Sequence, residues 1–503
     1  MIGRSMLAYI PVNLANIVVS FGTVVILTRL LSAAEFGRYA VAIITMQFAH
    51  MAIFTWIEAA MARFQARAEK EGDVAHHLKT LYSLGAGMCL FASLFFAVFY
   101  YFIPLTGPMK TVIGFALAST CIQVFFNIGM EAHRASHRIK RYSLSFSFQT
   151  LLSFSLGIIL ILTTPLREIA PFIGIMIGVS FVLIFDLLFM LPKMKGGKFS
   201  RVKTKDYAAY ALPISLSLLL SYALNSADVY LIAGYMGEAS AGEYNAGYNL
   251  ANRSLEIIFV WLAMAVTPLA VSAFEQDGAE NSKSIMRDYG ATLLLIALPA
   301  ATGIALVAKD AGFIMGESVR DNAVTVMPLI AFAGVLNGFI NYYVQRAFML
   351  SGATKSFAWV MLPPFIMNIG LNLWLIPLYG LMGAVYATVA AYSLGAVLSM
   401  IIARRHYPLP LPIKALGQIS VACGLMSISV LTMPWPEAWP DAVRLILKAG
   451  WGAFVYGFAC WVMNIANCRN LAQLLRTKFS PTRNNDSAGD IKGANDIEGA
   501  VYE

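Results

Sequence analysis

Charged residues are scarce in this sequence. Only 13% of its 503 residues are Asp, Glu, Lys or Arg, whereas 59% are hydrophobic. A soluble globular protein carries about 25% charged residues, so the chain lacks the side chains needed to cover a surface that faces water. This scarcity excludes an ordinary soluble protein and indicates an all-α polytopic membrane protein.

Cysteines are also few, and complete enzyme motifs are missing. The five cysteines are scattered, four of them inside apolar runs, which argues against a disulfide framework or a cysteine metal site. The segment "SGATKS" ends like a phosphate-binding loop but has no Gly before Lys355 and no preceding strand. His133 and His137 have the spacing of two metal ligands, but the basic residues between 134 and 141 would repel a cation and suit anionic lipid headgroups better. We therefore expect no enzymatic activity, no metal site and no cofactor.

Long apolar runs are abundant instead. A membrane-spanning helix needs about 20 mostly apolar residues. The first charge-free stretch, residues 5–28, is too long for a cleaved signal peptide, so we expect it to remain as a span. Fourteen spans are predicted, roughly at 7–29, 37–62, 80–103, 111–132, 144–163, 170–191, 207–232, 242–272, 289–307, 323–349, 356–376, 380–402, 413–433 and 443–465.

The basic residues support this number of spans. With a cytoplasmic N-terminus, 26 Lys and Arg residues fall in cytoplasmic segments, 7 on the opposite side and three within spans. This bias follows the positive-inside rule, and one span more or fewer would destroy it. The net charge of +9 therefore reflects topology and not nucleic-acid binding. Both termini are predicted to be cytoplasmic, with a largely disordered tail over residues 469–503.

An internal repeat divides the chain. Gln123, Asn127 and Glu131 recur as Asn337, Asn341 and Gln345 at an offset of 214 residues. A Gly-x-Tyr segment recurs at an offset of 205, with Gly37 and Tyr39 matched by Gly242 and Tyr244. We predict two pseudo-symmetric lobes of six helices, residues 1–200 and 201–405, with two further helices over 406–468. Transporters built from such halves hold their substrate at the interface between them.

Four predicted helices carry polar stripes at helical spacing. Polar side chains avoid lipid, so the stripes mark faces that turn inward. The stripes comprise Asn13, Asn16, Ser20 and Thr23; Gln47, His50 and Glu58; Ser217, Ser221, Asn225 and Asp228; and Asn245, Asn249, Asn252 and Glu256. The helices that carry these stripes are the first two of each half. Convergence of the four stripes would form a central cavity filled with water. Hydrogen bonds between helices are the alternative explanation.

Three segments carry a resemblance to a known family. "LTRLLSAAEFGRYA", "DVYLIAGYMGEASAGEYNAGYNLA" and "NIGLNLWLIPLYGLMGAVYAT" resemble Wzx-like polysaccharide transporters of the multidrug/oligosaccharidyl-lipid/polysaccharide (MOP) flippase superfamily. The resemblance extends from Met1 to about Asn467. It implies a two-lobed bundle in the bacterial inner membrane that opens alternately to either side. It also implies a polyprenyl-diphosphate-linked oligosaccharide as cargo, and a polysaccharide polymerase and export machinery as partners.

The two Gly-x-Tyr segments join the first two helices of each half, at the predicted outer face. Gly37 and Gly242 would permit a tight turn or a close helix approach, and the tyrosines would suit the membrane interface. We expect Glu35, paired with Arg29 or Arg38, to latch an outer gate. The alternative is a solvated loop with ordinary surface charges.

Ionisable groups within spans need a partner or a role, because each costs about 2.5–3.5 kcal/mol on insertion scales. Arg253 is the best candidate for a diphosphate ligand, because its planar fork matches phosphate oxygens; a static ion pair with Glu256 is the alternative. The other predicted substrate ligands are Arg346, Arg29, Asn249, Asn252, Gln47 and Asn225. The predicted proton or Na⁺ coupling residues are Asp228, Glu58, His50, Asp186 and Glu256.

Two other functions are compatible with parts of the sequence. A cation-coupled multidrug antiporter of the same superfamily would need a cavity dominated by acids and aromatics. A membrane polysaccharide polymerase or ligase would need a sizeable outer loop, whereas the longest outer connection is the segment "AKDAGFIMGESVRDN". A scaffold without transport would leave the polar stripes unexplained.

Overall fold

A computed structural model describes residues 8–102, 105 and 107–465 of the protein, and within these ranges it is helical without any strand. Thirteen helices are long and apolar enough to cross a membrane, and one bent pair of helices adds a fourteenth span. The predicted number of spans is therefore confirmed. The predicted tail, residues 469–503, lies outside the described residues.

Two sets of helices correspond to the two halves of the sequence. The first half comprises α2 (Ile10–Gly22), the π-helix η1 (Thr23–Leu27), α3 (Thr28–Leu30), α4 (Ala33–Ile53), α5 (Thr55–Glu71), α6 (Val74–Phe102), α7 (Gly107–Ala135), α8 (Ile139–Thr163), the 3-10 helix η2 (Arg167–Ile169) and α9 (Ala170–Met194). The second half comprises α10 (Arg201–Met236), α11 (Glu238–Ala311), the 3-10 helix η3 (Gly312–Ile314), α12 (Glu317–Gly338), the π-helix η4 (Phe339–Val344), α13 (Gln345–Leu350), α14 (Thr354–Tyr379) and α15 (Leu381–His406). Two more helices follow, α16 (Ile413–Thr432) and α17 (Asp441–Met463).

Two breaks set the course of the longest helices. The second predicted span is bent by 52° between α4 and α5, at Phe54, which is fully buried. The eighth and ninth predicted spans form one continuous element, α11, which is broken only at Gly278 with φ of 76°. Glycine tolerates this left-handed conformation without steric cost, so the chain reverses its path there.

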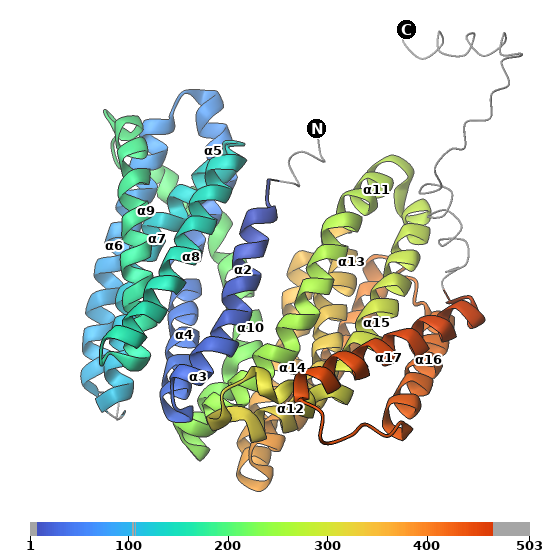
Figure 1. The fold of residues 1–503 in the computed structure, drawn as a ribbon. Helices are drawn as coiled ribbons and strands as arrows, with labels where there is room; N and C mark the ends of the chain where they lie inside the picture. Colours follow the sequence, from blue (N-terminus) through green and yellow to red (C-terminus); the bar gives the residue numbers. More distant parts are fainter. Residues whose placement is uncertain (1–7, 103–104, 106, 466–503) are drawn as a thin grey trace, which may run out of the picture.

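The two sets of helices lie side by side and share α10. Figure 1 shows α5 to α9 on one side and α12 to α17 on the other, with α2 running between them. The sets meet around α3 and α12 and diverge toward the end where α2 begins. Helix α10 packs against α4 and α5 as well as against α11 and α14. The lobe boundary at residues 200 and 201 therefore stays a prediction, because the first helix of the second half contacts both sets.

The outer helix faces are apolar and the inner faces carry the buried polar groups. In α9, Ile184, Leu188 and Leu191 follow one helical face and are 58%, 66% and 55% exposed. On another face of the same helix, Asp186 is only 3% exposed. This arrangement is that of a helix whose outer face contacts lipid, where apolar exposure is favourable.

The orientation of the termini can be tested by labelling. We expect a cysteine in place of Glu317, at the start of α12, to react with an impermeant thiol reagent in intact cells. We expect a cysteine in place of Lys198, between α9 and α10, to react only after permeabilisation. Both side chains are exposed, so access to the reagent decides the result. The opposite labelling pattern would invert the predicted topology.

Candidate functional site

The repeated Gly-x-Tyr segments pack directly against each other at one end of the molecule. A Cβ atom added to Gly37 would lie 1.7 Å from the carbonyl oxygen of Glu238, and one added to Gly242 would lie 2.5 Å from that of Ala33. The first turns of α4 and α11 thus touch backbone to backbone. The predicted close helix approach is confirmed. We call this end, where α3 and α12 also meet, the closed end.

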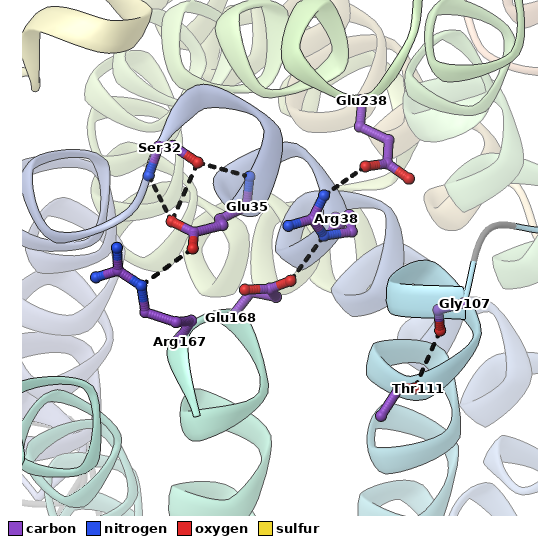
Figure 2. Close-up of polar contacts among 8 residues, drawn as sticks. All are labelled: Ser32, Glu35, Arg38, Gly107, Thr111, Arg167, Glu168 and Glu238. Atoms are coloured by element: carbon purple, nitrogen blue, oxygen red, sulfur yellow. Dashed lines mark hydrogen bonds and ion pairs between the residues drawn. The ribbon is translucent and has the colours of Figure 1, made fainter. Parts of the chain in front are cut away.

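Arg38 joins the two halves across the closed end (Figure 2). Its Nε lies 2.7 Å from Oε1 of Glu168 in η2, and its Nη1 lies 2.6 Å from Oε2 of Glu238 at the start of α11. The side chains of Arg38 and Glu168 are only 15% and 9% exposed. An arginine fork between two carboxylates in a partly buried setting holds its partners more firmly than a surface ion pair.

The predicted latch partners of Glu35 are wrong. Glu35 forms a capping box at the start of α4: its carboxylate accepts from the backbone N–H of Ser32 at 2.8 Å, and the Ser32 hydroxyl accepts from the Glu35 N–H. The other carboxylate oxygen pairs with Arg167 at 3.1 Å (Figure 2). Because the cap turns Glu35 back onto its own helix end, Arg38 binds Glu168 and Glu238 instead. Neither acid was singled out from the sequence.

The two repeated tyrosines are buried in the protein and are not the lipid-exposed aromatic side chains of an interfacial belt. Tyr39 is 9% exposed and Tyr244 is 1% exposed. The Tyr244 hydroxyl donates a 2.9 Å hydrogen bond to Asp228. Close packing of α4 against α11 encloses both rings, so they support the cavity wall described below.

A second set of contacts at the closed end joins α3 to the segment before α12, and Arg29 belongs to it. The backbone N–H of Gly316 donates to the Thr28 hydroxyl at 2.8 Å, and a Cβ atom on Gly316 would overlap the Thr28 carbonyl. Arg29 donates to the Phe313 carbonyl at 2.7 Å. Arg29 therefore joins α3 to η3 at the closed end, away from the cavity where a substrate ligand was predicted.

A cavity of about 600 Å³ lies between the two halves. Its polar residues come mainly from the second half, which contributes Asn225, Asn245, Asn249, Asn252, Asn337 and Asn341. The first half contributes Ser20, Thr23 and Gln47 among mostly apolar side chains. Of the predicted substrate ligands, the cavity thus brings together Gln47, Asn225, Asn249, Asn252 and Arg253.

The asparagines form short hydrogen-bonded ladders along the cavity wall. Asn249 donates to the side chain of Asn245 at 2.9 Å, and Asn341 donates to that of Asn337 at 2.7 Å. Asn337 in turn donates to Asn225 at 3.3 Å. Each ladder fixes the direction of its amides. In the described part of the chain, no hydrogen bond reaches the side-chain oxygens of Asn249 or Asn341, so these can accept from a ligand.

Among the described residues that line the central cavity, Arg253 and Glu256 are the only Lys, Arg, Asp or Glu side chains. Their side chains pair at 2.5 Å and are 47% and 37% exposed. They also line an adjoining cavity of about 320 Å³, with Asn13 and Asn16. The pair predicted as the alternative to a phosphate ligand is therefore present. The contact uses Nη1 of the guanidinium, and among the described residues no other hydrogen bond or ion pair of Arg253 is found.

The polar stripe of the first span faces inward as predicted. Asn13 and Asn16 line the adjoining cavity, while Ser20 and Thr23 line the central one. Arg346 is not among the residues lining either cavity; its Nη1 lies 3.6 Å from the sulfur of Met349. Helix periodicity marks which face avoids lipid, but it does not tell a cavity wall from a packed helix contact.

Asp228 lies behind the cavity wall and not on it. It is 2% exposed and accepts hydrogen bonds from Tyr244 at 2.9 Å, Asn372 at 2.7 Å and Thr388 at 2.5 Å. No Lys, Arg or His lies within ion-pair distance of it in the described ranges. A carboxylate buried without a cation is costly, so Asp228 stays a candidate for binding a proton or a metal cation. The sequence signal for this pocket was the segment "NIGLN", in which Asn368 and Asn372 lie one helical turn apart.

Of the other predicted coupling residues, Glu256 lines the central cavity, whereas Glu58, His50 and Asp186 lie in the first half, outside it. His50 pairs with Glu58 at 2.9 Å across the bend at Phe54, and Asn127 lies 3.4 Å from the same imidazole nitrogen. His133 pairs with Asp186 at 2.6 Å, with exposures of 1% and 2% for the two side chains. Gln47 of the same stripe reaches the cavity because it precedes the bend, whereas His50 and Glu58 turn toward α7.

Two comparisons of the sequence with known proteins gave matches. A family model described as "Polysaccharide biosynthesis protein" matches residues 26–318. The "Probable flippase AglR" of Haloferax volcanii is 24% identical over 365 residues, which are 70% of this chain and 73% of that protein.

Solved structures share the fold. A structure titled "Lipid II flippase MurJ, inward closed conformation" covers 93% of this chain and all of its own, with a TM-score of 0.74 and 16% identity. An inward-facing multidrug resistance MATE family transporter of the MOP superfamily covers 76% of this chain and 94% of its own, with a TM-score of 0.62 and 15% identity. The chain thus shares the fold of these two transporters.

Proposed function

Because the chain belongs to the polysaccharide biosynthesis protein family, we propose that it is an alternating-access flippase for a polyprenyl-diphosphate-linked oligosaccharide. The proposed direction is from the cytoplasmic to the periplasmic leaflet of a bacterial inner membrane. The observation that carries the proposal is a cavity of about 600 Å³ between two halves that touch backbone to backbone at one end. Such a cavity serves a carrier that opens to one side at a time.

The cavity chemistry supports a glycan as cargo. Carboxamides both donate and accept hydrogen bonds, which matches the hydroxyl and N-acetyl groups of sugars. Three lining tyrosines, Tyr222, Tyr248 and Tyr342, add flat apolar faces with a polar edge. Tyr342 is held by stacking on Phe259, with ring centroids 5.6 Å apart and an angle of 8°. A wall of amides and rings therefore favours an uncharged sugar moiety.

The multidrug antiporter alternative fits this cavity less well. An organic cation needs a carboxylate without a partner, and the only acid lining the central cavity, Glu256, is paired with Arg253. The shared fold of MATE transporters is compatible with either function. The distinction therefore depends on the cavity chemistry and on transport measurements.

Reconstitution tests the proposed function. The full chain is placed in proteoliposomes with a fluorescent polyprenyl-diphosphate-linked oligosaccharide in one set and a fluorescent organic cation in another. We expect the lipid-linked glycan to reach the opposite leaflet, measured as the fraction accessible to an impermeant quencher, and the cation gradient to be unaffected. Transport of the cation alone would replace the flippase by the antiporter.

Replacement of Arg253 by Ala tests the proposed phosphate contact. We expect flipping to fall about 10- to 100-fold, because a hydrogen bond to a charged group contributes about 1.5–3 kcal/mol. Arg253→Lys should restore part of the rate, since an ammonium lacks the planar fork. Arg287→Ala, on the part of α11 that follows the break at Gly278 and with a 64% exposed side chain, is the matched control.

The double variant Arg253→Ala/Glu256→Ala separates a ligand from a static pair. If Arg253 only neutralises Glu256, removing both side chains restores flipping. If Arg253 binds the diphosphate, the double variant stays as slow as Arg253→Ala. Protein abundance, measured by immunoblot of membranes, should remain normal in both variants.

A further inference from the structure

A basic cluster lies away from the central cavity, where α7 and α9 end and α8 begins. Three cations surround the ring of Phe189: Cζ of Arg141 and Nζ of Lys193 are each 3.8 Å from its centroid, and Cζ of Arg138 is 5.2 Å from it. Because both groups are 3.8 Å from the same ring centroid, Cζ of Arg141 and Nζ of Lys193 are separated by at most twice that distance. The ring attracts each cation by about 0.5–1 kcal/mol at an exposed site, but it does not neutralise their mutual repulsion.

The neighbouring acids leave part of this charge uncompensated. Asp186 binds His133 at 2.6 Å and is 3.6 Å from Arg141. Glu69 accepts hydrogen bonds from Ser136 at 2.5 Å and from Gln65 at 3.0 Å. Within the described ranges, no carboxylate lies within 4.0 Å of Arg138 or Lys193. Glu69 and Asp186 thus act on these two cations only at longer range, without forming an ion pair.

A cavity opens beside the two cations. Its volume is about 490 Å³, and its lining includes Arg138 and Lys193 together with the apolar side chains of Leu78 and Met190. Glu69 also lines it, with its carboxylate held by Ser136 and Gln65. This size is within the range of small-molecule sites, about 300–1,000 Å³. One side of the cavity is cationic and another is apolar, which suits a phosphate ester that carries an apolar body.

The surroundings place this cavity at the edge of the bilayer. Leu188 and Leu191 of the same helix, α9, are 66% and 55% exposed and belong to the lipid-facing surface. Lys193 follows within one turn of Leu191. A basic pocket between helix ends at this depth meets lipid headgroups.

We propose that the cavity bounded by α5, α6, α7 and α9 binds the phosphate of an anionic phospholipid, with Arg138 and Lys193 as its ligands. Arg138 can donate two parallel hydrogen bonds to phosphate oxygens, and Lys193 adds a point charge. The bound phosphate would relieve the repulsion around Phe189 and tie the α7–α8 connection to the end of α9. The site is independent of the cargo and of the proposed function.

Lipid titration of the purified full chain tests the site. Short-chain phosphatidylglycerol is added to the detergent-solubilised protein, and the rise in Tm is fitted to an apparent Kd. Phosphatidylcholine of the same chain length tests for charge, and inorganic phosphate tests for a free anion. The double variant Arg138→Gln/Lys193→Gln removes the proposed ligands. The control Arg404→Gln/Arg405→Gln removes two exposed charges at the end of α15.

We expect phosphatidylglycerol, and not phosphatidylcholine, to raise the Tm of the wild-type protein. The apparent Kd should increase roughly tenfold or more in Arg138→Gln/Lys193→Gln, because charge-assisted hydrogen bonds are lost, and stay unchanged in the control. An equal loss in both double variants would show general surface charge and overturn the site. An equal effect of inorganic phosphate at the same concentration would overturn the lipid as its source. Because no transport is measured, a failed flipping assay would leave this result unaffected.

Discussion

Replacement of Gly37 by Ala is expected to abolish most of the flipping activity. The new Cβ would lie 1.7 Å from the Glu238 carbonyl oxygen, so α4 and α11 must separate at the closed end. Overpacking of this kind costs about 1–3 kcal/mol or more, and about 3 kcal/mol lowers the population of the closed state roughly 100-fold. Flipping in proteoliposomes measures the loss.

The same variant should change access to the cavity. A cysteine in place of Asn245 should react with an impermeant reagent added from the α3 side in the Gly37→Ala background, but not in the wild-type background. Gly87→Ala is the matched control, because nothing lies within 4 Å of a Cβ atom there and Ala is favoured over Gly in a helix by about 0.5–1 kcal/mol. Normal flipping with unchanged access in Gly37→Ala would show that the closed end does not act as a gate.

Replacement of Asp228 by Asn is expected to remove the response of flipping to a cation gradient. The amide is isosteric with the carboxylate and can still accept from Tyr244 and Thr388. It carries no charge, however, and therefore no longer needs a proton or Na⁺ in a pocket that is 2% exposed. Flipping is measured under a pH gradient or a Na⁺ gradient, with the membrane potential held at zero. The gradient-driven increase in rate should disappear.

The control for this variant is Asp288→Asn, at a side chain that is 77% exposed on α11. Stability provides a second readout: Asp228→Asn should leave the Tm unchanged or raise it, because it removes a buried charge without a cationic partner. If the gradient response persists in Asp228→Asn, the coupling ion binds elsewhere, with Glu58 and His50 as the next pair to test. If flipping responds only to membrane potential, the charge of the cargo itself drives the cycle.

Tyr244 connects the closed end to the pocket around Asp228. Tyr244 follows Gly242, which contacts α4 at the closed end, and its hydroxyl binds Asp228. A separation of α4 from α11 would therefore disturb the wall between the cavity and the carboxylate. This proximity gives a physical route by which ion binding and gate opening could be coupled, and double variants at Gly37 and Asp228 would measure it.

The membrane class and the number of spans followed from the sequence alone. Scarce charge and runs of about 20 apolar residues are dictated by the bilayer itself, so they do not depend on how the helices pack. The inward faces of the first span and of the start of α11 were predicted for the same reason, since Asn16 and Asn249 must both avoid lipid. The close approach of Gly37 to Gly242 was also predicted from the sequence, because both copies of the repeat carry a glycine there and glycine has no side chain to keep two helices apart.

Only the tertiary structure decided which polar groups meet. Arg38 binds Glu168 and Glu238, which are 130 and 200 residues away along the chain, and the local candidate Glu35 is taken by its own helix cap. Asp228 and Asn225 share one stripe, yet one is sealed behind the cavity wall and the other lines it. Periodicity reports only that a face is shielded from lipid; the rotation and spacing of the neighbouring helices determine whether that face meets water, a partner side chain or a ligand.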